Sequence, residues 1–154
     1  MIYKGPWMAE RYSSLKTFFD THPDEIFQVT YRAISGSDRF SAADAFAAQH
    51  RLADLKRIIE PIWDEVDAIV TPTVPRAYTI AEVLENPVEL NNNLGYYTNF
   101  VNLLDLCAIA IPAEVGEAGL PFSITLAAPA WNEDGLCSLA TEFSSIGAKE
   151  SHPS

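Results

Sequence analysis

The amino-acid sequence predicts an α/β fold, in which helices flank a central sheet. The first observation is that apolar residues recur at helical spacing in several long segments. The second is that three short runs, residues 67–72, 107–111 and 122–126, are apolar almost throughout. Such runs are typical of strands that are buried on both faces. Three strands need further neighbours at their edges, so the sequence also predicts that they are part of a larger sheet.

The first half of the chain is predicted to be helical. We expect a helix from Pro6 to about His22, because proline suits the first helical position, where backbone N–H groups lack partners. A short second helix is expected over residues 24–33, ending in the turn around Gly36.

The longest helix is expected over residues 41–63. Ser41 and Asp44 have the spacing of a capping box, in which each side chain bonds the other residue's backbone N–H. Pro61 should kink or terminate this helix, because proline lacks the N–H that an interior turn requires.

The second half alternates strands and helices. A proline-rich loop through Pro75 and Tyr78 should follow the first strand, and a helix is expected over residues 89–105 despite Gly95. A last helix is expected over residues 134–143. We therefore expect one domain over residues 1–143 and a flexible tail over residues 144–154.

The charge distribution limits the partners. The formal net charge is -11, from 10 basic and 21 acidic residues, which argues against nucleic acid because phosphate binding needs clustered Lys and Arg. No Lys or Arg occurs in residues 77–148, whereas nine carboxylates do. Two interpretations stay open, a solvated acidic face or a face beside a basic surface of another segment or subunit.

The sequence favours a reduced, cytoplasmic setting without membrane insertion. It has neither an apolar leader nor a run of about 18 apolar residues that would span a bilayer. Cys107 and Cys137 lie in apolar stretches without CxxC spacing, so we expect buried, reduced thiols. Two cysteines and three scattered histidines do not predict a metal site.

No catalytic residue is predicted within the chain. The G-x-S-x-G, H-E-x-x-H and S-x-x-K motifs and a glycine-rich phosphate loop are absent from the sequence. Ser13-Ser14 and Ser144-Ser145 are expected to face solvent, and His22, His50 and His152 to be structural or exposed. The pair Glu133-Asp134 precedes a helix, where carboxylates serve the helix dipole.

One pair of residues suits anion binding. Tyr3 and Arg11 lie eight residues apart on either side of the Gly5-Pro6 helix start. A guanidinium can hold a carboxylate through two parallel hydrogen bonds, and a phenol can add a third. The alternative is that Arg11 forms a surface salt bridge with Glu10 or another nearby acid.

Five blocks between Ile2 and Phe143 resemble the allophanate hydrolases of the amidase-signature family. The first and fourth blocks are specific within that family, whereas the third and fifth are shared more widely. The blocks are YKGPWMAERY at residues 3–12, SAADAF at 41–46, VTPT at 70–73, NNNLGYYTNFVNLLD at 91–105 and GLPFSITL at 119–126.

This resemblance implies the C-terminal part of the amidase-signature fold, with a central mixed sheet. Members use a Ser–cis-Ser–Lys triad that lies N-terminal to the part matched here, and they need no cofactor. The positions of Tyr3 and Arg11 would bind the carboxylate of allophanate, which is hydrolysed to ammonia and carbon dioxide during urea degradation. Ser123 and Glu114 depart from the family pattern, so backbone geometry should differ there. Family members often form homodimers.

Three hypotheses about function stay open. The chain is a fragment of an amidohydrolase that lacks the nucleophile, or a binding module or one subunit of a split amidase, or an enzyme with an unrecognised nucleophile. The first two imply a small carboxylate-bearing amide as ligand. They also imply that an N-terminal amidase segment or a partner subunit supplies the missing chemistry.

Overall fold

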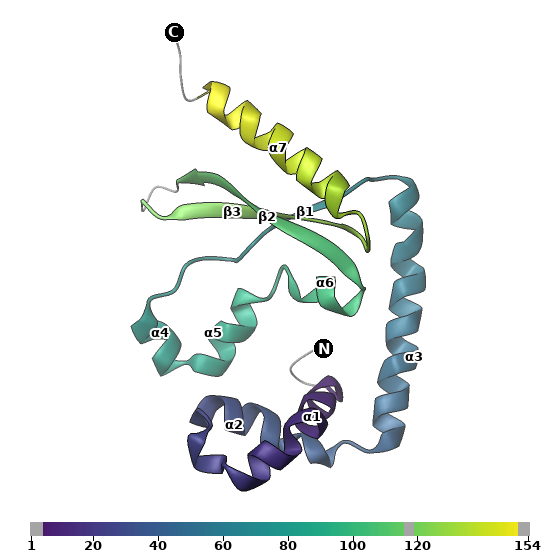
Figure 1. The fold of residues 1–154 in the computed structure, drawn as a ribbon, viewed down its shortest axis with the longest axis vertical. Coiled ribbons are helices and arrows are strands. Elements are labelled where there is room, and N and C mark those ends of the chain that lie inside the picture. Colours follow the sequence, from purple (N-terminus) through teal and green to yellow (C-terminus); the bar gives the residue numbers. More distant parts are fainter. Residues whose placement is uncertain (1–4, 116–118, 151–154) are drawn as a thin grey trace. The chain divides into compact units, whose positions relative to one another are not determined.

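The computed structural model describes residues 5–115 and 119–150 of the chain (Figure 1). The chain divides into two compact units. Unit 1 comprises Met1–Leu55 with Thr79–Asn92, and unit 2 comprises Lys56–Tyr78 with Asn93–Ser154. The predicted limits of a single domain at residues 1–143 stay a prediction.

Unit 1 begins with two helices that pack on each other. α1 (Trp7–Thr21) confirms the predicted first helix, with Pro6 at its N-cap. The second helix is shorter than predicted, because residues around Pro23 form a 3-10 turn, η1 (Pro23–Glu25), before α2 (Gln28–Ser35) begins. A further 3-10 turn, η2 (Gly36–Arg39), follows α2 directly and contacts α1.

An apolar and aromatic cluster holds these two helices together. Met8 and Phe19 of α1 and Ile34 of α2 are buried, and partly buried side chains surround them. The ring of Phe19 stacks on Tyr31 of α2 at 5.6 Å and meets the edge of Tyr12 at 6.0 Å. Aromatic pairs at these distances stabilise the contact beyond their buried area. One face of α1 is thereby anchored.

The predicted cap and end of the long helix are confirmed. α3 (Ala42–Ile59) is preceded by Ser41, whose Oγ accepts a hydrogen bond from the backbone N–H of Asp44 at 3.2 Å. The Asp44 carboxylate in turn accepts from the Ser41 backbone N–H at 2.9 Å. The α-helix ends just before Pro61, and the chain continues as a 3-10 turn, η3 (Glu60–Asp64).

The prediction of a single helix over residues 89–105 is wrong. The chain instead forms α5 (Pro87–Leu94) and α6 (Asn99–Leu103), which a turn at Gly95 separates. A Cβ at residue 95 would lie 2.5 Å from Asn99 Oδ1, so glycine permits this close approach. A further helix, α4 (Ile80–Glu85), follows the expected loop in a stretch for which no element was predicted, and its N-terminus is a capping box between Thr79 and Glu82.

Unit 2 contains a three-stranded sheet in the order β1-β3-β2. The strands are β1 (Ile69–Pro72), β2 (Leu106–Val115) and β3 (Pro121–Pro129), and each falls on one of the three predicted runs. Both pairings within the described residues are antiparallel, whereas the sequence resemblance predicted a mixed sheet. The short connection between β2 and β3 explains the pairing of those two strands, because a hairpin is antiparallel.

α7 (Glu133–Glu150) packs on β2 and β3 (Figure 1). Ile111, Leu126, Ala128 and Leu136 form the buried cluster between this helix and the sheet. We expected the helix to end at Phe143, but it continues for seven more residues before position 151, where the described residues end. Side chains that alternate along β2 and β3 thus bury one face of the sheet under α7.

Helices long and apolar enough to cross a bilayer are absent from the part of the chain that the structure describes.

Candidate carboxylate-binding site

Arg11 lies on the solvent-exposed side of α1. Met8 and Phe19 of the same helix are fixed in the cluster with α2, so the helix backbone that carries Arg11 is held in place. The exposed side chain can be reached by a small anion from solvent. A guanidinium offers five N–H donors in a planar arrangement that matches both oxygens of a carboxylate.

Tyr3, the predicted partner of Arg11, lies outside the described residues. The pair of Tyr3 and Arg11 as a carboxylate clamp therefore stays a prediction.

Trp7 is a candidate donor that the sequence pattern does not reveal. Its Nε1 is buried and has no hydrogen-bond partner among the groups that the structure describes. Most buried polar groups in proteins are paired, so this N–H is a candidate to bind a group from outside the described residues. Trp7 lies one helical turn before Arg11, and residues four apart are neighbours on a helix surface. From its spacing alone, Trp7 is only an apolar helix position.

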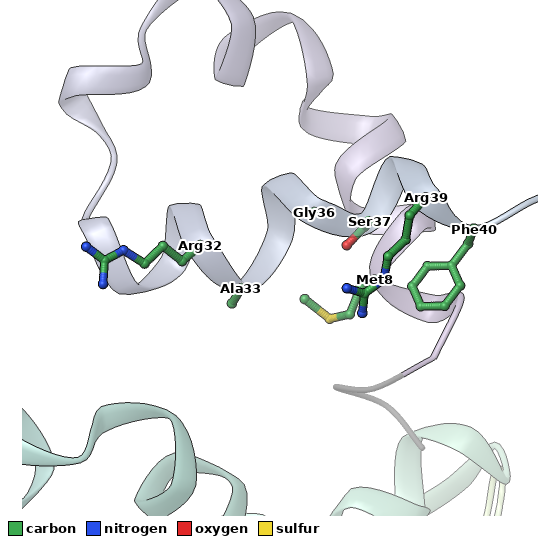
Figure 2. A pocket seen from close by; sticks show the side chains of 7 residues that line it. All are labelled: Met8, Arg32, Ala33, Gly36, Ser37, Arg39 and Phe40. Atoms are coloured by element: carbon green, nitrogen blue, oxygen red, sulfur yellow. The ribbon is translucent and has the colours of Figure 1, made fainter.

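A small pocket lies at the junction of α1, α2 and η2, and the Arg32 side chain extends away from Ser37 and Arg39 there (Figure 2). Its volume open to water-sized molecules is about 60 Å3. Ser37 is only 3% exposed, whereas both arginines of the pocket are exposed. The lining residues are Met8, Arg32, Ala33, Gly36, Ser37, Arg39 and Phe40.

The serines that the sequence singles out are not arranged as nucleophiles where their hydrogen bonds are described. Ser14 on α1 is exposed and donates a hydrogen bond to the backbone carbonyl of Glu10 at 3.1 Å. Ser144 on α7 donates in the same way to Ala140 at 2.9 Å, and Ser145 donates to Glu142 at 2.7 Å. Such bonds to the preceding turn are ordinary for helical serines, and they engage the hydroxyls away from any base.

The two lysines whose side chains the structure describes are engaged with aspartates. Lys16 donates to Asp20 at 2.6 Å, and this hydrogen bond raises the pKa of Lys16 above its usual value. Lys56 pairs with Asp105. A general base must be neutral when it accepts a proton, and an aspartate partner favours the charged form instead. Neither lysine is therefore arranged as the base of a serine.

The histidines and the acidic pair agree with their structural interpretation. His22 is exposed and stacks on Phe18 at 5.1 Å, and His50 is exposed on α3, whereas His152 lies outside the described residues. Glu133 and Asp134 occupy the first turn of α7, as expected for residues that serve the helix dipole. Groups of three or more potential metal ligands are absent from the described residues.

Side-chain hydrogen bonds connect residues of the third, fourth and fifth family-like blocks, or residues next to them, in unit 2. In the first contact, Asn93 Nδ2 donates to Tyr78 Oη at 3.0 Å and ties the fourth block to the loop after β1. In the second, Thr125 Oγ1 donates to Thr73 Oγ1 at 2.9 Å and joins the fifth block to the third. The hydroxyl of Thr71 is buried on the same strand face and lacks a partner among the described groups. The first and second blocks, in contrast, belong to unit 1.

The positions that depart from the family pattern lie in the β2–β3 pair. Ser123 is within β3, and its backbone carbonyl accepts from the N–H of Thr73 at 3.0 Å. The pairing register shifts between Pro112 and Val115, where Glu114 lies. The side chain of Glu114 is outside the described residues. Such a shift bends the strand locally.

The cysteines differ in their surroundings. Both are free, and Cys107 is partly buried, with its thiol donating to the carbonyl of Pro129 at 3.1 Å. The prediction that Cys137 is buried is wrong, because it lies on the exposed side of α7. Its neighbour Leu136 faces the sheet, and adjacent helical residues point about 100° apart.

Comparisons with known proteins agree with one another. The Amidase family matches residues 7–137. Urea amidolyase of Saccharomyces cerevisiae is 33% identical over 144 residues, which make up 92% of this chain and 8% of that protein. Selenomethionine-substituted allophanate hydrolase of Kluyveromyces lactis matches 95% of this chain, with a TM-score of 0.90 and 34% identity. The crystal structure of Kluyveromyces lactis urea amidolyase matches the same share with the same score and identity.

These relatives are much longer than the chain. It spans 24% of the allophanate hydrolase and 9% of the urea amidolyase from Kluyveromyces lactis. The similarity in backbone confirms the predicted resemblance to the allophanate hydrolases and the predicted fold class.

Proposed function

Since this chain belongs to the Amidase family, we propose that it forms part of an amidohydrolase that cleaves a small amide bearing a carboxylate. Allophanate is the proposed substrate, and the chain contributes the part that recognises its carboxylate. The acyl-accepting serine and its lysine come from residues outside these 154. A chain of this kind works either as a segment of a longer enzyme or as a subunit that meets its catalytic partner.

The observation that carries this proposal is the place of Arg11 on an anchored helix. Arg11 is exposed near the start of this helix, where a small anion from solvent can reach its guanidinium. A guanidinium matches both oxygens of a carboxylate, which supports an anionic ligand at this position. The proteins named allophanate hydrolase and urea amidolyase share this backbone at 34% identity, which supports allophanate over other small amides.

The proposed role of Arg11 is to bind and orient the substrate. Two parallel hydrogen bonds from the guanidinium would hold the carboxylate, and Tyr3 would add a third. Fixing one end of a small planar molecule limits the positions of its amide carbon. Orientation of this kind reduces the entropy that is lost on reaching the transition state.

We place the nucleophile outside these 154 residues because the described serine and lysine side chains are engaged elsewhere. Ser14, Ser144 and Ser145 bond to backbone carbonyls of their own helices, and both described lysine side chains pair with aspartates. Hydrolysis through an acyl-enzyme needs a hydroxyl beside a neutral base.

The test replaces the equivalent segment of Kluyveromyces lactis allophanate hydrolase with this chain and measures ammonia release from allophanate. The chimera should turn over, whereas the purified chain alone should not. In the chimera, Arg11→Leu should weaken substrate binding by about 2–5 kcal/mol, as for loss of one partner of a buried charge pair. At the lower end this is a rise in KM of roughly 30-fold.

The matched control is Lys16→Leu, which removes a cation from the exposed surface of the same helix. It should leave KM close to that of the unsubstituted chimera. Release of ammonia by the chain alone would refute the external nucleophile. An active chimera in which Arg11→Leu leaves KM unchanged would refute the carboxylate clamp, whatever the outcome for the nucleophile.

A further inference from the structure

The open edge of β1 carries an inference that rests on the proposed function and deepens it. β1 is an end strand, because the strand order of the sheet within the described residues is β1-β3-β2. An end strand presents backbone N–H and C=O groups that have no neighbouring strand to bond. β2, at the other end, has a register shift between Pro112 and Val115, and such irregularities block an edge. β1 therefore offers the more regular edge for a further strand.

The register of β1 on β3 shows which backbone groups point outward. The N–H of Thr73 donates to the carbonyl of Ser123 at 3.0 Å, and Thr71 lies two residues earlier on the same ladder. Hydrogen-bonded and non-hydrogen-bonded pairs alternate along an antiparallel ladder, so the backbone groups of Thr71 and Thr73 point toward β3. The N–H and C=O of Val70 point to the open edge instead, as does the carbonyl of Pro72. Pro72 has no N–H, so Val70 supplies the outward donor of this strand.

The side chain of Val70 is exposed on the face of the sheet that α7 covers over β2 and β3. Val70 lies opposite Leu126, and the side chains of opposite residues share one face of an antiparallel pair. Leu126 is 7% exposed in the cluster with Leu136 of α7, whereas Val70 is 58% exposed. Val70 therefore continues an apolar face beyond the part that the helix covers.

We propose that β1 pairs with a strand of the catalytic amidase segment, which the proposed function places outside these 154 residues. Backbone hydrogen bonds at Val70 would extend the sheet, and the added segment would cover the Val70 side chain. The length of the relatives supports this partner. The backbone of this chain recurs with a TM-score of 0.90 in Kluyveromyces lactis allophanate hydrolase, where it corresponds to 24% of the chain. Most of such an enzyme is thus available to supply the strand.

A second copy of this chain suits the edge less well. Two copies of β1 would pair symmetrically about Val70, and each would present Pro72, which has no N–H, to the other copy. Since β1 is only 4 residues long, this pair would form few backbone hydrogen bonds. A strand without proline could bond all the outward groups of β1, which favours a different segment as the partner.

Hydrogen exchange at single amides, read by fragmentation mass spectrometry, tests the pairing. The Val70 amide should exchange at least roughly 100-fold more slowly in the chimera with Kluyveromyces lactis allophanate hydrolase than in the purified chain, because a strand partner protects it. The Thr71 amide points toward β3, so it should be protected in both proteins. The measurement uses the folded chimera whether or not it releases ammonia, and its result is therefore separate from the test of the nucleophile.

Two results would overturn the proposal. The first is a Val70 amide that stays unprotected in the folded chimera. The second is protection of Val70 in the purified chain that rises with protein concentration, because it would assign the edge to a second copy.

Val70→Lys provides an independent test, with Val88→Lys as its matched control. Val88 on α5 is 57% exposed, close to the 58% of Val70, but it lies on a helix. Either lysine should leave the urea midpoint of the purified chain nearly unchanged, because both positions are exposed. In the chimera, Val70→Lys should lower the midpoint by about 1 M, since pairing would bury the ammonium, and Val88→Lys should not. Equal losses from the two variants would contradict the assignment to β1.

Discussion

Replacement of Leu136 by alanine should show how strongly α7 is held on the sheet. Leu136 is 2% exposed and contacts the buried cluster that Ile111, Leu126 and Ala128 form. Alanine lacks three carbon atoms of leucine, whose burial is worth about 0.8 kcal/mol each, or about 2.4 kcal/mol together. The cavity that remains adds to this loss, so we expect destabilisation of about 3–4 kcal/mol.

Urea unfolding followed by circular dichroism measures this change. For a slope of about 1–3 kcal/mol per molar urea, the midpoint should fall by roughly 1–4 M. Leu139→Ala is the matched control, because this leucine is on the same helix but 40% exposed. It should cost less than about 1 kcal/mol, since exposed positions contribute little to stability. Equal midpoints for the two variants would refute the packing of α7 through Leu136.

Three further perturbations test local features of the fold. Thr79→Ala removes the cap of α4 and should cost about 1 kcal/mol, measured by the same urea titration; an unchanged midpoint would contradict the capping box. Gly119→Ala should cost about 1–2 kcal/mol because Gly119 has a φ of +73°, whereas Gly36→Ala meets no atom within 4 Å and should be near neutral. The hydrogen bonds from Ser41 lower the pKa of Asp44, so the stability that this carboxylate adds should be present near neutral pH and lost as pH falls through that lowered value. An NMR titration that places the pKa of Asp44 at or above the usual aspartate value would contradict this cap.

Much of the fold can be predicted from local sequence signals for helix caps and strands. The cap at Ser41 can be predicted, because its hydrogen bonds lie within four consecutive residues. The three strands can be found because apolar runs next to prolines and glycines are local features. The Thr79 cap of α4 has the same spacing with glutamate, but the prolines just before it favour a loop, which hides the short helix.

The break at Gly95 cannot be predicted from periodicity. Apolar residues on both sides of Gly95 keep a helical spacing, but the turn depends on the contact between Gly95 and the Asn99 side chain. The antiparallel pairing of β1 with β3 is likewise a contact between residues far apart in the chain. Tertiary contacts of this kind override local preference, and single-sequence patterns do not contain them.

The candidate site can be predicted only in part. Arg11 stands out because its charge does not suit its place on the helix, and that argument needs the sequence alone. The pocket residues Ser37 and Arg39 do not stand out, because their position beside Met8 comes from the turn of η2 back onto α1. Trp7 escapes prediction for a different reason, since an unpaired indole N–H is visible only once the described surroundings of the ring are known.

The acidic second half of the chain can be explained without a basic partner. Four of its nine carboxylates lie in the first turns of helices, at Glu82 in α4, Glu89 in α5, and Glu133 and Asp134 in α7. Negative charge at a helix N-terminus is stabilising, and Glu82 also accepts a hydrogen bond from the backbone N–H of Thr79. The helices of this half thus account for a large share of its carboxylates, which supports a solvated acidic face over a basic neighbour.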